Sequence, residues 1–365
     1  MKPSLSGLTI CIFTYERKLD LERLVKYWSS TDVKVIILDA SNQPAKILNS
    51  KNLKYLHTPN ASVQKRLLKF SEIVETKYIL LSPDDDFFAL EGISKTLKFL
   101  DNNSEFSSAQ GLRIRFFDFP NFHWIPDYVK QMMLKFVEKD KIERLNKMAS
   151  SMHYIYSVIR VTDFTKIVKC FNNVNTEKRD ASMMGELIFN YTLPVLGKHI
   201  VLPVFYSARK AHPYEGGDIV FGNWINDESD ADRNIFVSNV IEFYVSEIKC
   251  TKSEALSIFS NLTKNFTRVK PVNADKNIMH KRFVRKIVFR SKLCKLYIIL
   301  KIKYKRFARK IIFRSKLRTL YSISKINFFK LYILLIKNHM FLQFLRDFRV
   351  IKHFLDNNRI KYKNL

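Results

Sequence analysis

Short apolar runs alternate with amphipathic segments along the first hundred residues of this 365-residue chain. Residues 8–14 form a continuous apolar run rich in β-branched side chains, which is typical of a strand buried on both faces. Leu21, Leu24 and Trp28 then recur at helical spacing. The same signals return further along, with strands at residues 33–38, 53–56 and 77–81 and a helix at residues 63–74. This alternation predicts an α/β fold with an open, twisted, mostly parallel sheet flanked by helices.

The second part of the chain has a less regular order. Strands are predicted at residues 107–119, 154–161 and 199–206, and helices at residues 126–148 and around residues 181–193. The chain is longer than a usual single domain, so further regions are expected. We predict a sheet domain over residues 1–225, a helical extension over residues 226–280 and a basic helical tail over residues 281–365.

The positive charge of the chain is concentrated in the tail. Residues 281–365 hold 25 lysines and arginines but only two acidic residues, so they carry 23 of the 29 net positive charges. The basic and apolar motif at residues 282–293 recurs at residues 306–317, which predicts a duplicated amphipathic helix. Such helices bind anionic membrane surfaces or pack into bundles, and both alternatives stay open here. We expect a cytoplasmic protein attached peripherally to the inner face of the cell membrane.

Several common sites are absent from the sequence. The four cysteines are widely spaced, which indicates neither a zinc site nor a disulfide framework and fits a reducing cytoplasm. No apolar run approaches the roughly 18 residues of a membrane-spanning helix. There is no G-x-x-x-x-G-K-[ST] loop, and no G-x-G-x-x-G follows the first strand. A nucleotide bound here must therefore be held by side chains and a metal. No nucleophile elbow is present, so covalent acyl chemistry is not expected.

Polar side chains gather where three of the predicted strands end. They are Thr14, Tyr15, Glu16 and Arg17 after the first strand, Asp39 and Ser41 after the second, and Asp84, Asp85 and Asp86 after the fourth. The carboxyl ends of parallel strands meet at one edge of an open α/β sheet, which is where ligands bind. The sequence therefore predicts a binding site at this edge.

Three successive carboxylates after an apolar strand indicate a metal. Carboxylate oxygens suit Mg²⁺ or Mn²⁺, and Mg²⁺ is commonly held by one or two acidic side chains together with substrate phosphates. A phosphate ester is therefore the expected ligand. The alternative is a solvated acidic turn in which Asp84 caps a helix that begins near Ala89, because aspartate is a favoured N-cap.

The same residues resemble family 2 glycosyltransferases of the nucleotide-sugar-binding GT-A type. Thr14-Tyr15-Glu16-Arg17 is similar to the TYxR motif of a bacterial subgroup, and the run from Asp84 to Phe87 matches its DDDF motif. The family usually has asparagine where Glu16 stands. The second strand, with Asp39 and Ser41, is similar to the strand whose aspartate contacts the nucleotide base. The resemblance covers about residues 7–215.

This resemblance implies metal-dependent transfer of a sugar from a nucleotide diphosphate to an acceptor hydroxyl. Asp84 or Asp86 would hold Mn²⁺ or Mg²⁺, Asp85 would reach ribose or sugar hydroxyls, and His212 would be a further metal ligand. Inversion at the sugar needs a general base, for which Glu186 is the first candidate and Asp180 the second. Thr14, Tyr15, Arg17, Asp39 and Ser41 would complete the donor site.

Three classes of function are compatible with these features. The first is a glycosyltransferase that builds surface polysaccharide or lipid-linked glycan, with its tail at the membrane and its acceptor a glycan or glycolipid. The second is a nucleic-acid-binding protein, but the basic repeats lack a recognised nucleic-acid motif and the aspartates would repel phosphate. The third is a nucleotidyl or phosphoryl transferase with the same metal site. We expect the first, and no nucleic-acid partner.

Overall fold

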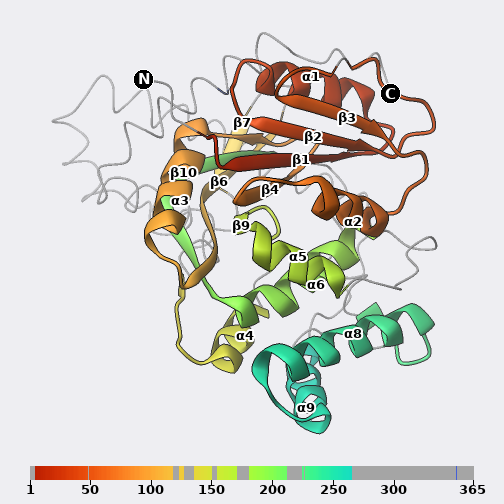
Figure 1. Ribbon diagram of the computed structural model, residues 1–365, viewed down its shortest axis with the longest axis vertical. Coiled ribbons are helices and arrows are strands. Elements are labelled where there is room, and N and C mark those ends of the chain that lie inside the picture. Colours follow the sequence, from red (N-terminus) through yellow and green to blue (C-terminus); the bar gives the residue numbers. More distant parts are fainter. Residues whose placement is uncertain are drawn as a thin grey trace, which may run out of the picture.

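The computed structural model of the protein describes residues 5–47, 49–117, 123–126, 135–149, 154–170, 181–211, 224–225, 227–264 and 351. These residues form one ten-stranded sheet and eight helices, and helices lie on both faces of the sheet (Figure 1). The predicted α/β fold, an open sheet flanked by helices, is confirmed.

The elements follow one another along the chain with mostly short connections in the first hundred residues. The strands are β1 Leu8–Thr14, β2 Lys34–Asp39, β3 Leu53–His57, β4 Tyr78–Pro83, β5 Phe87–Phe88, β6 Phe106–Phe117, β7 His123–Pro126, β8 Lys135–Phe136, β9 Val158–Arg160 and β10 Lys198–Lys210. The helices are α1 Lys18–Trp28, α2 Val63–Ile73, α3 Leu90–Asn102, α4 Lys141–Ala149, α5 Val161–Lys169, α6 Ala181–Leu196, α8 Ala231–Ile248 and α9 Lys252–Thr263.

The sheet has a parallel half and a mixed half. Its strand order is β3-β2-β1-β4-β9-β6-β10-β5, with β7 paired to β6 and β8 paired to β10. The first four strands of this order are parallel to one another, and β10 is parallel to β6. Strand β9 runs antiparallel to both β4 and β6, so one reversed strand separates the two parallel groups.

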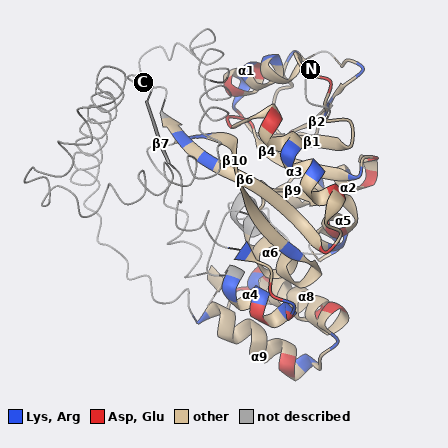
Figure 2. Ribbon diagram, turned by 90° about the vertical axis from the view of Figure 1, so that its left-hand side faces the viewer, with Lys and Arg blue, Asp and Glu red and all other residues tan. Residues whose placement is uncertain are grey.

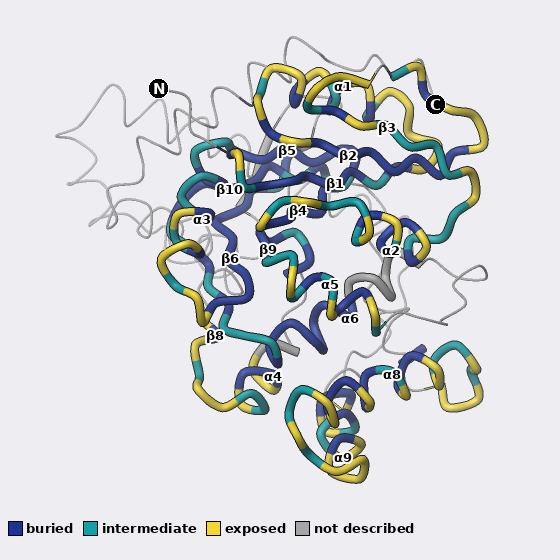
Figure 3. Tube along the Cα trace, in the orientation of Figure 1, coloured by how far each residue is buried: buried dark blue, intermediate teal, exposed yellow. Residues whose placement is uncertain are grey.

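The two faces of the sheet build two hydrophobic cores. Along β1, Ile10 and Ile12 belong to the core under α1 and α3, whereas Cys11 belongs to the core under α2, α5 and α6. Successive side chains of a strand point to opposite faces, so a strand covered on both faces must be apolar throughout. Helices α4, α8 and α9 form a further layer outside α6 (Figures 1 and 2). The central strands are accordingly buried and the outer faces of the helices exposed (Figure 3).

The structure differs from the sequence prediction around residues 126–148 and 154–161. Within residues 135–149, a helix begins at Lys141, whereas residues 135–136 form a strand that pairs with β10. The buried Phe136 ring of this strand contacts Tyr154 edge to face. The predicted strand is limited to β9. Ser157 N donates to Tyr154 O in the turn before it, and α5 begins directly after it. In both segments the secondary structure is set by pairing and packing with distant residues, which the local hydrophobic periodicity does not indicate.

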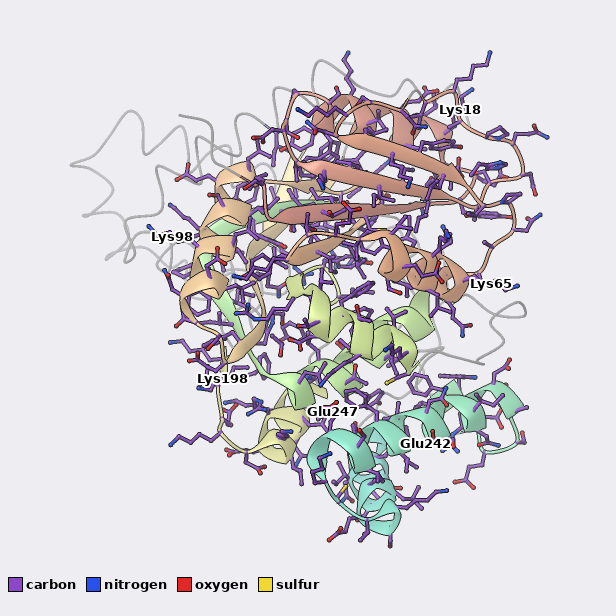
Figure 4. All side chains as sticks on the ribbon, viewed as in Figure 1. Lys18, Lys65, Lys98, Lys198, Glu242 and Glu247 are labelled. Carbon is purple, nitrogen blue, oxygen red and sulfur yellow. The ribbon has the colours of Figure 1, made fainter. Side chains whose placement is uncertain are left out.

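Helices α8 and α9 lie within the predicted helical extension and are tied to the sheet domain. Tyr244 Oη donates to Tyr191 O at 3.0 Å, which joins α8 to α6. Glu247, labelled in Figure 4, forms an ion pair with Lys166 of α5 at 2.9 Å. The predicted tail lies outside the described residues except for Ile351, which is buried in the core under α1 and α3. Among the described residues, no helix combines the length and apolarity needed to cross a membrane.

Candidate functional site

The candidate site lies at the carboxyl edge of the parallel half of the sheet. Strand β1 pairs with β2 on one side and with β4 on the other, so the strand order reverses beside β1. Ligands of open α/β sheets bind outside the carboxyl ends of the strands at such a switch point. Thr14 ends β1, Asp39 ends β2 and Asp84 follows directly after β4. The parallel strands β1, β2 and β4 lie side by side (Figure 1), so the three polar clusters at their carboxyl ends share one edge.

Asp84 and Asp85 are held together by residues at the end of β1 and in the turn after it. Thr14 Oγ1 donates to Asp84 Oδ2 at 2.7 Å, and Arg17 Nη1 donates to Asp84 Oδ1 at 3.2 Å. The same Nη1 donates to Asp85 Oδ2 at 2.9 Å. The N-cap of α3 is Ala89, which makes no side-chain cap. Asp84 therefore does not cap this helix, and the alternative of a simple capping turn is wrong.

Asp86 is held in place by Lys210, the last residue of the last strand in sequence order. The backbone N–H of Lys210, the last residue of β10, donates to Asp86 Oδ1 at 2.9 Å. The buried Lys210 ammonium donates to Asp20 Oδ1 of α1 at 2.9 Å, and Arg23 Nη2 donates to the same oxygen at 3.0 Å. Asp20, Arg23 and Lys210 were not singled out from the sequence. The contact between Lys210 and Asp86 spans 124 residues, so no local pattern could have revealed it.

The buried carboxylates are costly to ionise. Burial and the neighbouring Asp85 charge raise the pKa of Asp84 to about 7, against the lowering effects of Arg17 and Thr14. Burial and Asp85 also raise the pKa of Asp86 well above its ordinary value. Loss of hydration and like-charge repulsion both disfavour the charged form of a carboxyl. A bound cation would relieve both penalties.

Basic residues of β6 and β10 border Asp86. Arg209 and Arg113 oppose the rise in the Asp86 pKa by their positive charge. Arg209 pairs in register with Arg115 on the parallel strand β6, and its guanidinium carbon lies 5.7 Å from the centroid of the Tyr156 ring. The acidic turn therefore has cations on the β10 side as well as Arg17 beside β1.

Asp39 shapes the second part of the site. Its Oδ1 accepts from Ser41 N at 2.9 Å and its Oδ2 from Tyr55 Oη at 2.7 Å. Burial alone would raise the pKa of Asp39, but the hydrogen bonds from Ser41 and Tyr55 lower it below the ordinary value. Burial and the bond to Asp39 in turn raise the pKa of Tyr55 to about 12. Asp39 is therefore an ionised acceptor, and Tyr55 is a partner that the sequence did not indicate.

The turn after β1 is braced against the turn after β2. Glu16 N donates to Ser41 Oγ at 2.8 Å, and Glu16 Oε1 accepts from Asn42 N at 2.8 Å. Glu16 has a φ of 54°, in the left-handed region where asparagine is strongly enriched among non-glycine residues. The Glu16 carboxylate supplies a bond across the two turns in this chain.

Arg66 of α2 stabilises the carboxyl ends of β1 and β2, which border the site. Its side chain is buried, and Nη1 donates to Thr14 O at 2.9 Å and to Leu38 O at 3.2 Å. The guanidinium lies over the Phe13 ring, 5.4 Å from its centroid. Arg66 thus ties the carboxyl ends of β1 and β2 together. Helical periodicity marked this segment only as a helix.

The residues present fit a cation that is shared with a ligand and do not form a complete protein cage. Among the described residues, no group of three or more His, Cys, Asp or Glu is arranged to hold a metal by itself. The three aspartates lie in one turn, yet each has a different set of protein partners. Mg²⁺ is typically bound by one or two carboxylates plus substrate phosphates, and the oxygen donors here suit that arrangement.

Three predicted residues cannot be placed against these side chains. His212 and Asp180 lie outside the described residues. The backbone of Glu186 belongs to α6, but its side chain is not among those described. Tyr15 is described and is 54% exposed in the turn after β1. The roles of these four residues stay predictions.

Comparison with protein-family models finds no match to this sequence, and comparison with curated proteins finds none either. Similar solved structures include S. aureus TarS residues 1–349, with a TM-score of 0.37 and 14% identity over 70% of this chain and 81% of that chain. The structure of TarS 1–349 in complex with UDP has a TM-score of 0.37 and 14% identity, covering 70% of this chain and 80% of that chain. Its complex with UDP-GlcNAc has a TM-score of 0.35 and 13% identity, covering 71% and 80%. A likeness this weak carries no functional inference.

Proposed function

We propose that this protein is a glycosyltransferase that moves a sugar from a nucleotide diphosphate donor to an acceptor hydroxyl with the help of Mg²⁺ or Mn²⁺. The observation that carries the proposal is the turn of three buried carboxylates at the switch point of the sheet, with Thr14 and Arg17 beside it. A carboxylate cluster repels a diphosphate unless a cation lies between them. The site therefore suits a ligand that brings phosphate and metal together.

The residues of the site divide into those that would hold the cation and those that would hold the donor. Asp84 and Asp86 are the proposed metal ligands, with His212 as a further one. When bound, the cation neutralises the charge that develops on the leaving diphosphate. Asp85 would accept hydrogen bonds from ribose or sugar hydroxyls. Thr14 and the backbone N–H of Lys210 keep the carboxylates in place.

A general base must take the proton of the acceptor hydroxyl if the reaction inverts the sugar. We propose Glu186 for this role and Asp180 as the second candidate. Glu186 belongs to the first half of α6 and directly precedes Leu187 and Ile188, which are buried in the core. Glutamine keeps the size of a glutamate side chain, so Glu186→Gln would isolate the loss of the basic oxygen from any change in this packing.

The acceptor and the membrane partner are proposed from the sequence. The tail of residues 281–365 would attach the enzyme to an anionic membrane surface, where a lipid-linked glycan or growing surface polysaccharide would be the acceptor. Each Lys or Arg near an anionic leaflet contributes about 1 kcal/mol of binding, so the charge of this segment is sufficient in principle.

A donor screen tests the proposed function. We expect release of nucleoside diphosphate from one class of nucleotide sugar, with loss of the activity in EDTA and its recovery on addition of Mn²⁺ or Mg²⁺. The released product distinguishes a glycosyltransferase from a nucleotidyl transferase, because the latter would release pyrophosphate. Release of pyrophosphate, or turnover that is indifferent to EDTA, would contradict the proposal.

Asp39 is expected to select the base of the donor. An ionised carboxylate only accepts hydrogen bonds, and Asp39 accepts them from Ser41 and Tyr55, with the Ala45 backbone contributing as well. A donor base would take the place of one of these partners. Uracil and guanine offer a ring N–H to such an acceptor, whereas adenine and cytosine do not. Asp39→Ala should weaken binding of UDP or GDP by about tenfold or more, the usual size for a hydrogen bond to a charged group.

The prediction is checked by calorimetric titration with UDP, GDP, ADP and CDP. Tyr55→Phe removes the hydroxyl that donates to Asp39 and accepts from Ala45 N but leaves the Asp39 carboxylate, so it should cause a smaller loss of the same base preference. Equal affinity of the unaltered protein for all four nucleotides, or an unchanged preference after Asp39→Ala, would show that Asp39 only stabilises the turn.

A further inference from the structure

Arg17 holds the place next to Asp84 and Asp85 that a cation would take. A single guanidinium nitrogen, Nη1, donates to Asp84 Oδ1 at 3.2 Å and to Asp85 Oδ2 at 2.9 Å. The side chains of the two carboxylates are only 5% and 4% exposed, whereas that of Arg17 is 46% exposed. The carboxylates thus belong to the protein interior, and the group that compensates them reaches in from the solvent side.

The contacts around Arg17 allow its side chain to move while its backbone stays in place. Arg17 is the N-cap residue of α1 but makes no side-chain cap, and its carbonyl accepts from Leu21 N at 3.0 Å. Asp84 keeps a second, independent bond from Thr14 when the guanidinium leaves. Loss of the contacts between Arg17 and the two carboxylates therefore costs neither the helix start nor the position of Asp84.

We propose that Arg17 has two binding partners in turn: the carboxylates of Asp84 and Asp85 in the free protein, and the diphosphate of the donor once a divalent cation binds Asp84 in its place. This inference rests on the proposed function. A divalent cation and a guanidinium cannot share the same oxygens, because their like charges repel at such distances. The displaced guanidinium remains beside the site, and its planar fork matches phosphate oxygens.

The two binding partners of Arg17 lead to opposite expected effects of its removal on metal affinity and on nucleotide affinity. In the absence of nucleotide, Arg17 competes with the metal, so its removal should strengthen Mn²⁺ binding. In the presence of Mn²⁺, Arg17 binds the diphosphate, so its removal should weaken nucleotide binding. A residue that contacted only phosphate would leave the affinity for the free metal unchanged. If Arg17 only stabilised the acidic turn, its removal would lower the affinity for both Mn²⁺ and the nucleotide.

The experiment compares Arg17→Met, Arg17→Lys and Lys18→Met in the full chain. Arg17→Met keeps the apolar stem and removes the charge, and Arg17→Lys keeps the charge without the fork. Lys18 is the matched control, because it is an exposed cation at the start of the same helix (Figure 4) and has no ion pair among the described residues. Mn²⁺ binding without nucleotide is measured by the loss of the free-ion signal in electron paramagnetic resonance. UDP binding at saturating Mn²⁺ is measured by calorimetry.

We expect Arg17→Met to bind Mn²⁺ about tenfold more tightly and UDP about tenfold more weakly, with Arg17→Lys close to the unaltered protein for Mn²⁺ and intermediate for UDP. Lys18→Met should change neither affinity appreciably. Unchanged or weaker Mn²⁺ binding in Arg17→Met, or an equal gain in Lys18→Met, overturns this inference alone. If neither the unaltered protein nor any variant binds Mn²⁺ or UDP, the proposed function fails and the inference fails with it.

Discussion

Asp86→Asn is expected to reduce sugar transfer by about 10³-fold or more while the protein stays folded. The substitution keeps the shape of the side chain and its ability to accept from Lys210 N, but it removes the charge that would bind the cation. Loss of the neutralising cation withdraws several kcal/mol of stabilisation from the developing diphosphate charge, and each ~1.36 kcal/mol of barrier is about tenfold in rate. Turnover is measured by nucleotide release at saturating donor.

The same substitution has a predicted sign for stability. The pKa of Asp86 is raised by burial and by Asp85, so the folded state disfavours its ionised form at neutral pH. Asp86→Asn should therefore keep or increase the melting temperature without metal. Asp101→Asn is the matched control: the bond from Lys77 lowers the pKa of Asp101, so its neutralisation should cost stability slightly and leave transfer unchanged. Near-normal turnover in Asp86→Asn would remove Asp86 from the metal site.

The metal-free protein is expected to gain stability from Asp84 as the pH falls from about 8 to about 5. The pKa of Asp84 is about 7 in the folded state and 3.8 for an unperturbed aspartate, so the folded state binds a proton in a range where the unfolded state does not. The contribution is fully present below the unfolded pKa and is lost as the pH rises through about 7. Across this range it amounts to about 2–3 kcal/mol.

The comparison that isolates this effect is the unaltered protein against Asp84→Asn, each unfolded by denaturant at several pH values. Other groups titrate in the same range. Burial lowers the pKa of His199 to about 3, so the contribution of that residue to stability falls as the pH drops below its ordinary pKa. This contribution is common to both proteins and cancels in the difference. If the difference in unfolding free energy between the two proteins stays constant across the pH range, the pKa of Asp84 is not raised in the folded state.

The carboxyl-edge site could be predicted because its main components are local in sequence. The apolar run of residues 8–14 must be a strand with both faces covered, and the helices on both sides of the sheet supply that cover. Once strands and helices alternate with short connections, the carboxyl ends of the first, second and fourth strands have to meet at one edge. Thr14, Asp39 and Asp84 needed no tertiary information beyond this rule to be placed together.

The tertiary structure alone decided how the carboxylates are held. Lys210, which is 124 residues further along the chain, donates its backbone N–H to Asp86. Tyr55 of the neighbouring strand β3 donates to Asp39. Arg66 of α2 donates to the carboxyl ends of both β1 and β2. These are contacts between elements far apart in the chain, and hydrophobic periodicity carries no record of them. The sequence by itself determined which strands exist and where their polar ends fall. Only the packing of β10, β3 and α2 against those ends determined the charge state and orientation of the aspartates, because burial and long-range hydrogen bonds set both.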